Sequence, residues 1–150
     1  MQSCLKGFAA IGLSMIGTAS FAADETSGPA WLFVQTASEF SVDGDTLTMP
    51  YEREIFAFTD RPYRMHDYLN AHELESLWHA GSDDFSENPP NAVITWVSGE
   101  EMREAEIELM SVSVDELGRS ISYNFIFEAG DDMPPAGSVV SLFIDGAYTG

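Results

Sequence analysis

Short runs of alternating apolar and polar residues dominate the chain beyond residue 30. Phe40 and Val42 alternate with polar residues before Asp43-Gly44, and Leu47 and Met49 do so after it. Such alternation predicts strands with one buried face. Asp-Gly between two of them predicts a β-hairpin with a type I′ turn.

Two other runs are apolar at every position. Residues 31–34 read Trp-Leu-Phe-Val and residues 55–58 read Ile-Phe-Ala-Phe, so we predict two strands that are buried on both faces. Residues 93–97 and 139–144 predict two more strands. Between residues 104 and 127 two alternating runs flank a turn at residues 115–118, and a change of phase between Leu109 and Met110 predicts a β-bulge.

One short helix is expected at about residues 71–80. Asn70 and Glu73 have the spacing of a capping box, and Leu69 precedes the cap as in a hydrophobic staple. Gly81 is expected to end the helix. Its predicted buried face consists of Ala71, Leu74, Leu77 and Trp78.

These elements define the expected fold class, which is mainly β. About eight short strands and one helix predict an antiparallel β-sandwich or open barrel. The expected organisation is a single domain over residues 31–146, with a flexible leader at 23–30 and a tail at 147–150.

Residues 1–22 have the pattern of a cleaved secretory signal. Lys6 precedes an apolar segment, and Ser20-Phe21-Ala22 offers small residues at the cleavage site. We therefore expect a periplasmic or secreted protein. Cleavage removes the single cysteine, Cys4, and the only lysine, so the exported chain has no disulfide or thiolate chemistry.

The charge balance restricts the partners. Asp and Glu number 25 against 6 Lys and Arg, which gives a formal net charge of −19. Phosphate-bearing partners would be repelled, so we expect no nucleic acid and no membrane association after signal cleavage. An unknown protein or a cationic ligand is the expected partner, with the oligomeric state open. A chain with so many acids and, after cleavage, no lysine also suits surroundings of high ionic strength.

The predicted helix carries three candidate metal ligands. His72, Glu75 and His79 share one side of it, and imidazole and carboxylate groups are zinc ligands. Their spacing departs from the HExxH arrangement and stretches over two helical turns. An exposed polar helix face explains the same residues, and we commit to no metal.

Asp60, Arg61 and Arg64 form the other candidate site. They follow the second fully apolar run and hold two of the five arginines left after signal cleavage. Arginine suits bidentate binding of carboxylates, which predicts an anion or partner-carboxylate site. Pairing with acids of the chain itself, which would fix the path into the helix, is the interpretation that we favour over such a site.

No catalytic residue and no cofactor is expected. The chain lacks a nucleophile elbow, a phosphate-binding glycine loop and a dinucleotide fingerprint. These absences favour a non-enzymatic domain that acts by binding or protein interaction. The alternative is a metal-dependent hydrolase or metal-binding protein that uses the His/Glu helix face.

Two motifs carry a resemblance to a family. Residues 58–64 match F-x-D-R-P-x-R and residues 89–92 read P-P-N-A, with a Trp-bearing helix between them. Together with Leu-Phe-Ile-Asp at 142–145, they resemble a family of small uncharacterised exported bacterial proteins over residues 31–145. The resemblance implies export but no activity. Met65-His66 departs from the family pattern, in which a small residue and glycine are commoner.

Overall fold

The computed structural model describes residues 30–79 and 85–146, which belong to one compact unit. The predicted signal, most of the leader, the tail and Gly81 lie outside the described residues. The strands are β2 (Trp31–Asp43), β3 (Thr46–Pro50), β4 (Ile55–Thr59), β5 (His66–Leu69), β6 (Asn91–Ser98), β7 (Glu101–Val114), β8 (Ser120–Gly130) and β9 (Ala136–Gly146). The helix α1 (Ala71–Ser76) lies between β5 and β6 in the chain.

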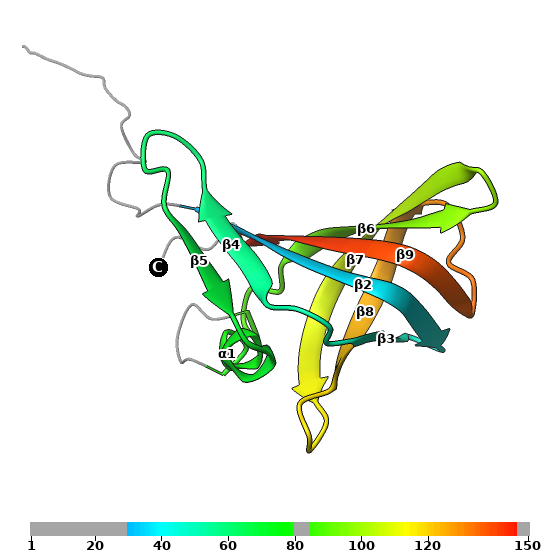
Figure 1. The fold of residues 1–150 in the computed structure, drawn as a ribbon, viewed down its shortest axis with the longest axis horizontal. Helices are drawn as coiled ribbons and strands as arrows, with labels where there is room; N and C mark the ends of the chain where they lie inside the picture. The colour runs from blue at the N-terminus through cyan, green and yellow to red at the C-terminus, as the bar shows by residue number, and fades with distance from the viewer. Residues whose placement is uncertain (1–29, 80–84, 147–150) are drawn as a thin grey trace, which may run out of the picture. The chain divides into compact units, whose positions relative to one another are not determined.

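The eight strands form one antiparallel sheet in the order β3-β8-β7-β6-β9-β2-β4-β5. Because β3 also pairs with β2, six of the strands close into a barrel, and β4 and β5 extend from it (Figure 1). The predicted mainly β, antiparallel barrel with one short helix is confirmed. No described helix is long and apolar enough to span a membrane.

β2 belongs to both parts of the sheet. Its first half pairs with β4 over Trp31–Val34, and its end pairs with β3 over Ser41–Asp43. The buried positions change phase between these halves, from Phe33 and Gln35 to Phe40. This change lets one strand line the barrel at one end and support the two-strand extension at the other.

The core fills the barrel and the concave side of the extension. The buried residues of β2, β3, β4, β6, β7, β8 and β9 form one cluster with Leu74 of α1 and Trp78 of the turn that follows it. The Trp78 indole N–H donates to the Leu109 carbonyl oxygen at 3.4 Å, and its ring packs 4.9 Å from that of Phe85. The helix segment therefore covers the inner surface between β5 and β7 (Figure 1).

The capping box at Asn70 and Glu73 is confirmed, with hydrogen bonds of 2.8 and 2.9 Å in the two directions. The helix itself is shorter than expected, because it ends at Ser76 and continues as turns through His79. Ala71, Leu74 and Trp78 are buried as predicted, and Leu77 is half-buried.

The hairpin between β2 and β3 is confirmed, but its turn is not type I′. Asp43 pairs with Thr46, so Gly44 and Asp45 form the loop. Only Gly44 of these two has a positive φ, at 64°, which is the pattern of a type II′ turn. The prediction placed the turn one residue too early along the chain.

The bulge predicted near Leu109 is confirmed by a register shift between Leu109 and Ser111. Two expectations about burial are wrong. Met110 is exposed rather than inward-facing, and Phe127 is 43% exposed although it continues the alternation of β8. The sequence does not predict β5, and it predicts two strands before Asp43 where the structure has the single strand β2. These two errors cancel, so the predicted and observed numbers of strands agree.

The most informative correction concerns the two fully apolar runs. Phe33 of β2 and Ala57 of β4 are buried, but their neighbours Leu32, Phe56 and Phe58 are only half-buried. The inner side of these strands packs on the core, and no described segment buries the outer side.

Candidate functional site: an apolar outer face

The apolar outer face is built by cross-strand neighbours. Tyr68 of β5 pairs with Phe56 of β4, which pairs with Val34 of β2. Val34 pairs with Phe143 of β9, and Phe143 pairs with Val93 of β6. Because paired residues of adjacent strands point to the same side of a sheet, this row runs across five strands.

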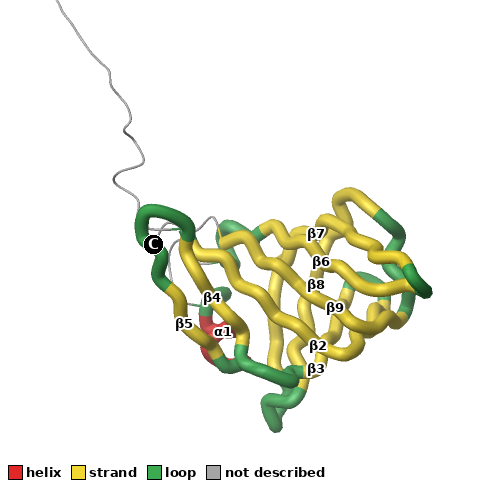
Figure 2. The backbone as a smooth tube through the Cα atoms, turned by 45° about the horizontal axis from the view of Figure 1, so that its top comes forward, coloured by secondary structure: helices red, strands yellow, loops and turns green. Residues whose placement is uncertain are grey.

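A second row runs beside the first. His66, Phe58 and Leu32 follow one another across β5, β4 and β2. The two rows are called the apolar face below, and Figure 2 shows the five strands that carry it side by side. Its members are Leu32, Val34, Phe56, Phe58, His66, Tyr68, Val93 and Phe143.

None of these eight side chains is buried, and Tyr68 is 53% exposed. The rings nonetheless pack on one another. Phe56 lies 5.3 Å from Phe58 in a stacked arrangement and 5.3 Å from Tyr68 in a tilted one. His66 lies 6.2 Å from Phe56. The rings are therefore held as a preformed surface whose outer side faces solvent among the described residues.

Charged groups border the apolar face on two sides. The β4–β5 loop, which forms much of the F-x-D-R-P-x-R segment, holds Arg61 and Arg64. On the opposite side, Glu106 and Glu108 point outward from β7. Their neighbours on β6 are Val93 and Asn91, so neither carboxylate faces a cation across that strand pair.

A hollow of about 330 Å³ lies at the acidic side of the face. Leu32, Val93 and Phe143 provide its apolar lining. Its polar lining includes the carboxylates of Glu106, Glu128 and Asp145. An apolar floor beside carboxylates suits a side chain with a long stem and a cationic end.

The free edge of the sheet next to this face is protected. β5 ends the strand order and has only four residues, His66–Leu69. The backbone N–H of Tyr68 donates to the Asp67 carboxylate at 2.8 Å, which occupies a donor of the edge strand. A short strand with a charged residue is a common protection against strand addition. The face, rather than the edge, is therefore the accessible surface.

The outer surface on the other side of the barrel is polar. Thr46 and Thr48 of β3 bond to Asn124 and Ser122 of β8, each at 3.0 Å, and the Asn124 amide donates to the Ser111 hydroxyl at 3.0 Å. These five residues are called the polar face below. Their side chains satisfy one another's hydrogen-bonding groups.

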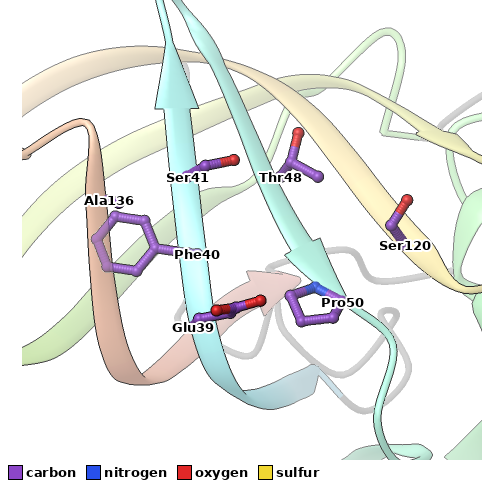
Figure 3. Close-up of a pocket in the computed structure, with 7 residues that line it drawn as sticks. All are labelled: Glu39, Phe40, Ser41, Thr48, Pro50, Ser120 and Ala136. Carbon is purple, nitrogen blue, oxygen red and sulfur yellow. The ribbon is translucent and has the colours of Figure 1, made fainter.

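A second hollow, of about 350 Å³, lies beside the polar face where β2, β3 and β8 meet. Figure 3 shows the hydroxyls of Ser41, Thr48 and Ser120 around it, with the Glu39 carboxylate at its margin. Phe40 also lines it, but the ring packs inward against Trp96, at 5.8 Å between centroids.

The predicted site residues Asp60, Arg61 and Arg64 lie together in the β4–β5 loop and are all exposed. The Asp60 carbonyl accepts hydrogen bonds from the N–H groups of Tyr63 and Arg64, each at 3.1 Å. No ion pair within residues 30–79 and 85–146 includes Arg61 or Arg64. Binding of a partner carboxylate by these arginines therefore stays a proposal.

The candidate metal ligands His72, Glu75 and His79 do not form a metal site among the described residues. His72 and Glu75 are 3.7 Å apart, between Nδ1 and Oε1, and His79 is exposed. Among the described residues, no group of three or more His, Cys, Asp or Glu side chains is arranged to hold a metal ion.

One polar pair crosses the barrel interior. The Tyr123 hydroxyl of β8 donates to the Gln35 side-chain oxygen of β2 at 2.6 Å, and both side chains are buried. Burial raises the pKa of Tyr123 well above its ordinary value. The Gln35 amide nitrogen has no hydrogen-bond partner among the described residues.

Sequence reasoning missed the residues of the apolar face. Phe56 and Phe58 are predicted to lie in a strand that is buried on both faces, Phe143 is predicted only as part of a strand, and the strand that holds Tyr68 is not predicted. A fully apolar run signals two apolar faces, but which strand lies near the sheet edge depends on topology.

In comparisons with known proteins, no family model, curated protein or solved structure matched the chain. The family resemblance therefore stays a prediction.

Proposed function

We propose that this protein is an exported, strongly acidic β-domain without enzymatic activity that acts by binding another protein through its apolar face. The single observation that carries the proposal is the row of side chains from Tyr68 to Val93, which crosses five strands and is nowhere buried. Contiguous apolar surface of this kind marks protein interaction sites.

The aromatic content of the face supports a protein partner. Aromatic side chains bury about 150–250 Å² each and dominate interface energetics. Phe56 already packs against Phe58 and against Tyr68, so little ordering of these side chains is needed on binding. Preorganisation of this type lowers the entropic cost of association.

The charged groups that border the apolar face also suit the binding of a protein. The face is a sheet surface with one open hollow, and the polar groups at its rim are exposed carboxylates and arginines. Charged rim groups around an apolar centre are the usual composition of protein interfaces.

Site-specific photocrosslinking in the native host tests this proposal. A photoreactive phenylalanine analogue replaces Tyr68 in one variant and Phe143 in another, and it replaces Ser122 and Asn124 of the polar face in two matched controls. We expect a crosslinked product of one defined mass from the first pair only. Mass spectrometry then identifies it, and the purified partner is bound again in vitro.

The four variants must retain the melting temperature of the unmodified chain. A partner crosslinked equally from Ser122 and Tyr68, or no product from Tyr68 and Phe143 in the exported protein, overturns the proposal. Loss of in-vitro binding in Phe143→Ser but not in Ser122→Ala supports it.

A further inference from the structure

We propose that the hollow at the acidic side of the apolar face binds an arginine side chain of the partner protein. This inference rests on the proposed function, because it names the residue of the partner that the face recognises. It is carried by the construction of the hollow, which has an apolar floor and a rim of three carboxylates that meet no cation among the described residues.

The floor of the hollow lies where β2, β9 and β6 run side by side (Figure 2). Phe143 of β9 pairs with Val93 of β6, and Leu32 of β2 pairs with Asp145 of β9. Leu32 and Val93 are half-buried and Phe143 is exposed, so a ligand can cover all three. The volume of about 330 Å³ is at the lower end of the range for ligand pockets, about 300–1,000 Å³, and suits a single side chain.

A β-bulge in β8 builds one side of the rim. Glu106 of β7 pairs with Ala129 of β8. Ile107 pairs with Phe127, so the intervening Glu128 is the extra residue of the bulge. In a bulge, two residues of one strand oppose a single residue of the other. Glu128 therefore lies beside Glu106, and both line the hollow.

The carboxylates of the rim have no partners in the chain. The side chains of Glu106, Glu128 and Asp145 make no hydrogen bond or ion pair with the described residues. Like charges that oppose each other on neighbouring strands destabilise a sheet, and no cation offsets this repulsion between Glu106 and Glu128. A cation in the hollow would relieve the repulsion, so its binding is favoured beyond its attraction to each carboxylate.

The combination of floor and rim selects arginine. Its guanidinium group stacks on aromatic rings such as Phe143 and binds carboxylates bidentately, and its aliphatic stem can cover Leu32 and Val93. Lysine fits less well, because its ammonium group is more strongly hydrated and is depleted in protein interfaces, where arginine is enriched. A metal ion also fits less well, since no acidic group in the described part of the chain is arranged to hold one.

Methyl NMR spectroscopy of the exported chain tests the hollow with model compounds. The probe is N-acetylarginine methylamide, and N-acetylcitrulline methylamide is its uncharged isostere. We expect saturable shifts of the Leu32 and Val93 methyl signals with the arginine compound, weaker binding of N-acetyllysine methylamide, and no shifts with the citrulline compound. Because the rim carboxylates are exposed, the affinity for the arginine compound should fall between about 0.1 M and about 1 M NaCl.

Neutral variants test the rim. A Glu106→Gln, Glu128→Gln double variant should weaken binding of the arginine compound by at least about fivefold. The matched control is a Glu100→Gln, Glu116→Gln double variant, which changes the net charge equally at two exposed turns outside the hollow and should bind as the unmodified chain does. Neither variant should lower the melting temperature, because none of the four carboxylates makes an ion pair or hydrogen bond with the described residues.

Three results overturn the inference. They are equal shifts with the arginine and citrulline compounds, a lysine compound that binds as tightly as the arginine compound, and equal weakening in both double variants.

Photocrosslinking in the host separates this inference from the proposed function. The product formed from position 68 should decrease in E106Q/E128Q but not in E100Q/E116Q. If the product forms equally in both, the hollow does not hold a residue of the partner, and the proposed function stands without this inference. If the arginine compound binds but no product forms from position 68 or 143, the proposed function fails, and with it the assignment of the arginine to a partner protein.

Discussion

The apolar face and the polar face are two outer surfaces of one sheet, and their inner surfaces are equally buried. Beneath the polar face, Leu47 and Ile121 are fully buried, and beneath the apolar face so are Ile55 and Ile144. The outer surfaces differ, because hydroxyl and amide groups satisfy one another on one and aromatic rings meet solvent on the other.

This difference separates the needs of folding from those of binding. A strand with one polar side needs only its inner side to fold, as β3 and β8 show. The outer rings of β4 and β9 are not needed to fill the core, so we infer that they serve contact with a partner. Neighbouring residues of one strand should therefore differ. Substitution of an inner residue should lower the stability of the fold, and substitution of an outer residue should weaken binding instead.

The largest expected effect comes from the inner residue of β9. Ile144→Ala should lower the free energy of unfolding by about 2–5 kcal/mol, because it leaves a cavity in a fully buried site. Phe143→Ser, one residue earlier and 37% exposed, should cost less than about 1 kcal/mol in the monomer. Urea unfolding followed by tryptophan fluorescence measures both.

The pair also has an outcome that breaks the comparison. Equal losses for Ile144→Ala and Phe143→Ser at a concentration where the chain is monomeric would mean that part of the chain itself covers Phe143. The apolar face would then be core, and the binding proposal would lose its support.

Much of the fold could be predicted from local patterns, because the inward residues of β3, β8 and β9 alternate and Asn70 and Glu73 signal a cap. The apolar face could not. Phe56 and Phe58 belong to a run that is apolar at odd and even positions alike, which is also the pattern of a strand covered on both sides. Which side is covered depends on where α1 packs and on β5, and β5 is a four-residue strand too short for a periodic signal.

A hydrogen bond joins the walls that carry the two faces. Tyr123→Phe should cost about 1–3 kcal/mol, because the buried Gln35 side chain then has no partner for either of its polar groups. A Gln35→Leu, Tyr123→Phe double variant should recover most of the loss, since it removes both buried polar groups. Denaturant unfolding of the two variants compares them. A double variant less stable than Tyr123→Phe would contradict this account.

Alkaline pH should act through the same tyrosine. Because burial raises the pKa of Tyr123, its neutral form supports the fold fully below the pKa of about 10 of an unfolded tyrosine. Above that pH the unfolded chain ionises first, so stability should fall by up to about 1.4 kcal/mol per pH unit.

The matched comparison for this pH effect is Tyr51. Desolvation, with smaller contributions from Glu54 and Glu73, also raises the pKa of Tyr51, but this side chain is only half-buried. The free energy of unfolding is measured between about pH 8 and pH 11, a range that includes the ordinary tyrosine pKa of about 10. Its fall with rising pH should be reduced more by Tyr123→Phe than by Tyr51→Phe. The reverse order would show that the interior pair does not control the alkaline limit.

The smallest expected effect belongs to the polar face. Asn124→Ala removes the hydrogen bonds to Thr46 and Ser111, but water replaces them at this exposed site, so the loss should stay below about 1 kcal/mol. Crosslinking from Tyr68 should be unchanged. If Asn124→Ala abolishes association with the partner while Phe143→Ser preserves it, the binding surface lies on the polar face. Binding would then not explain why the rings of the apolar face are exposed.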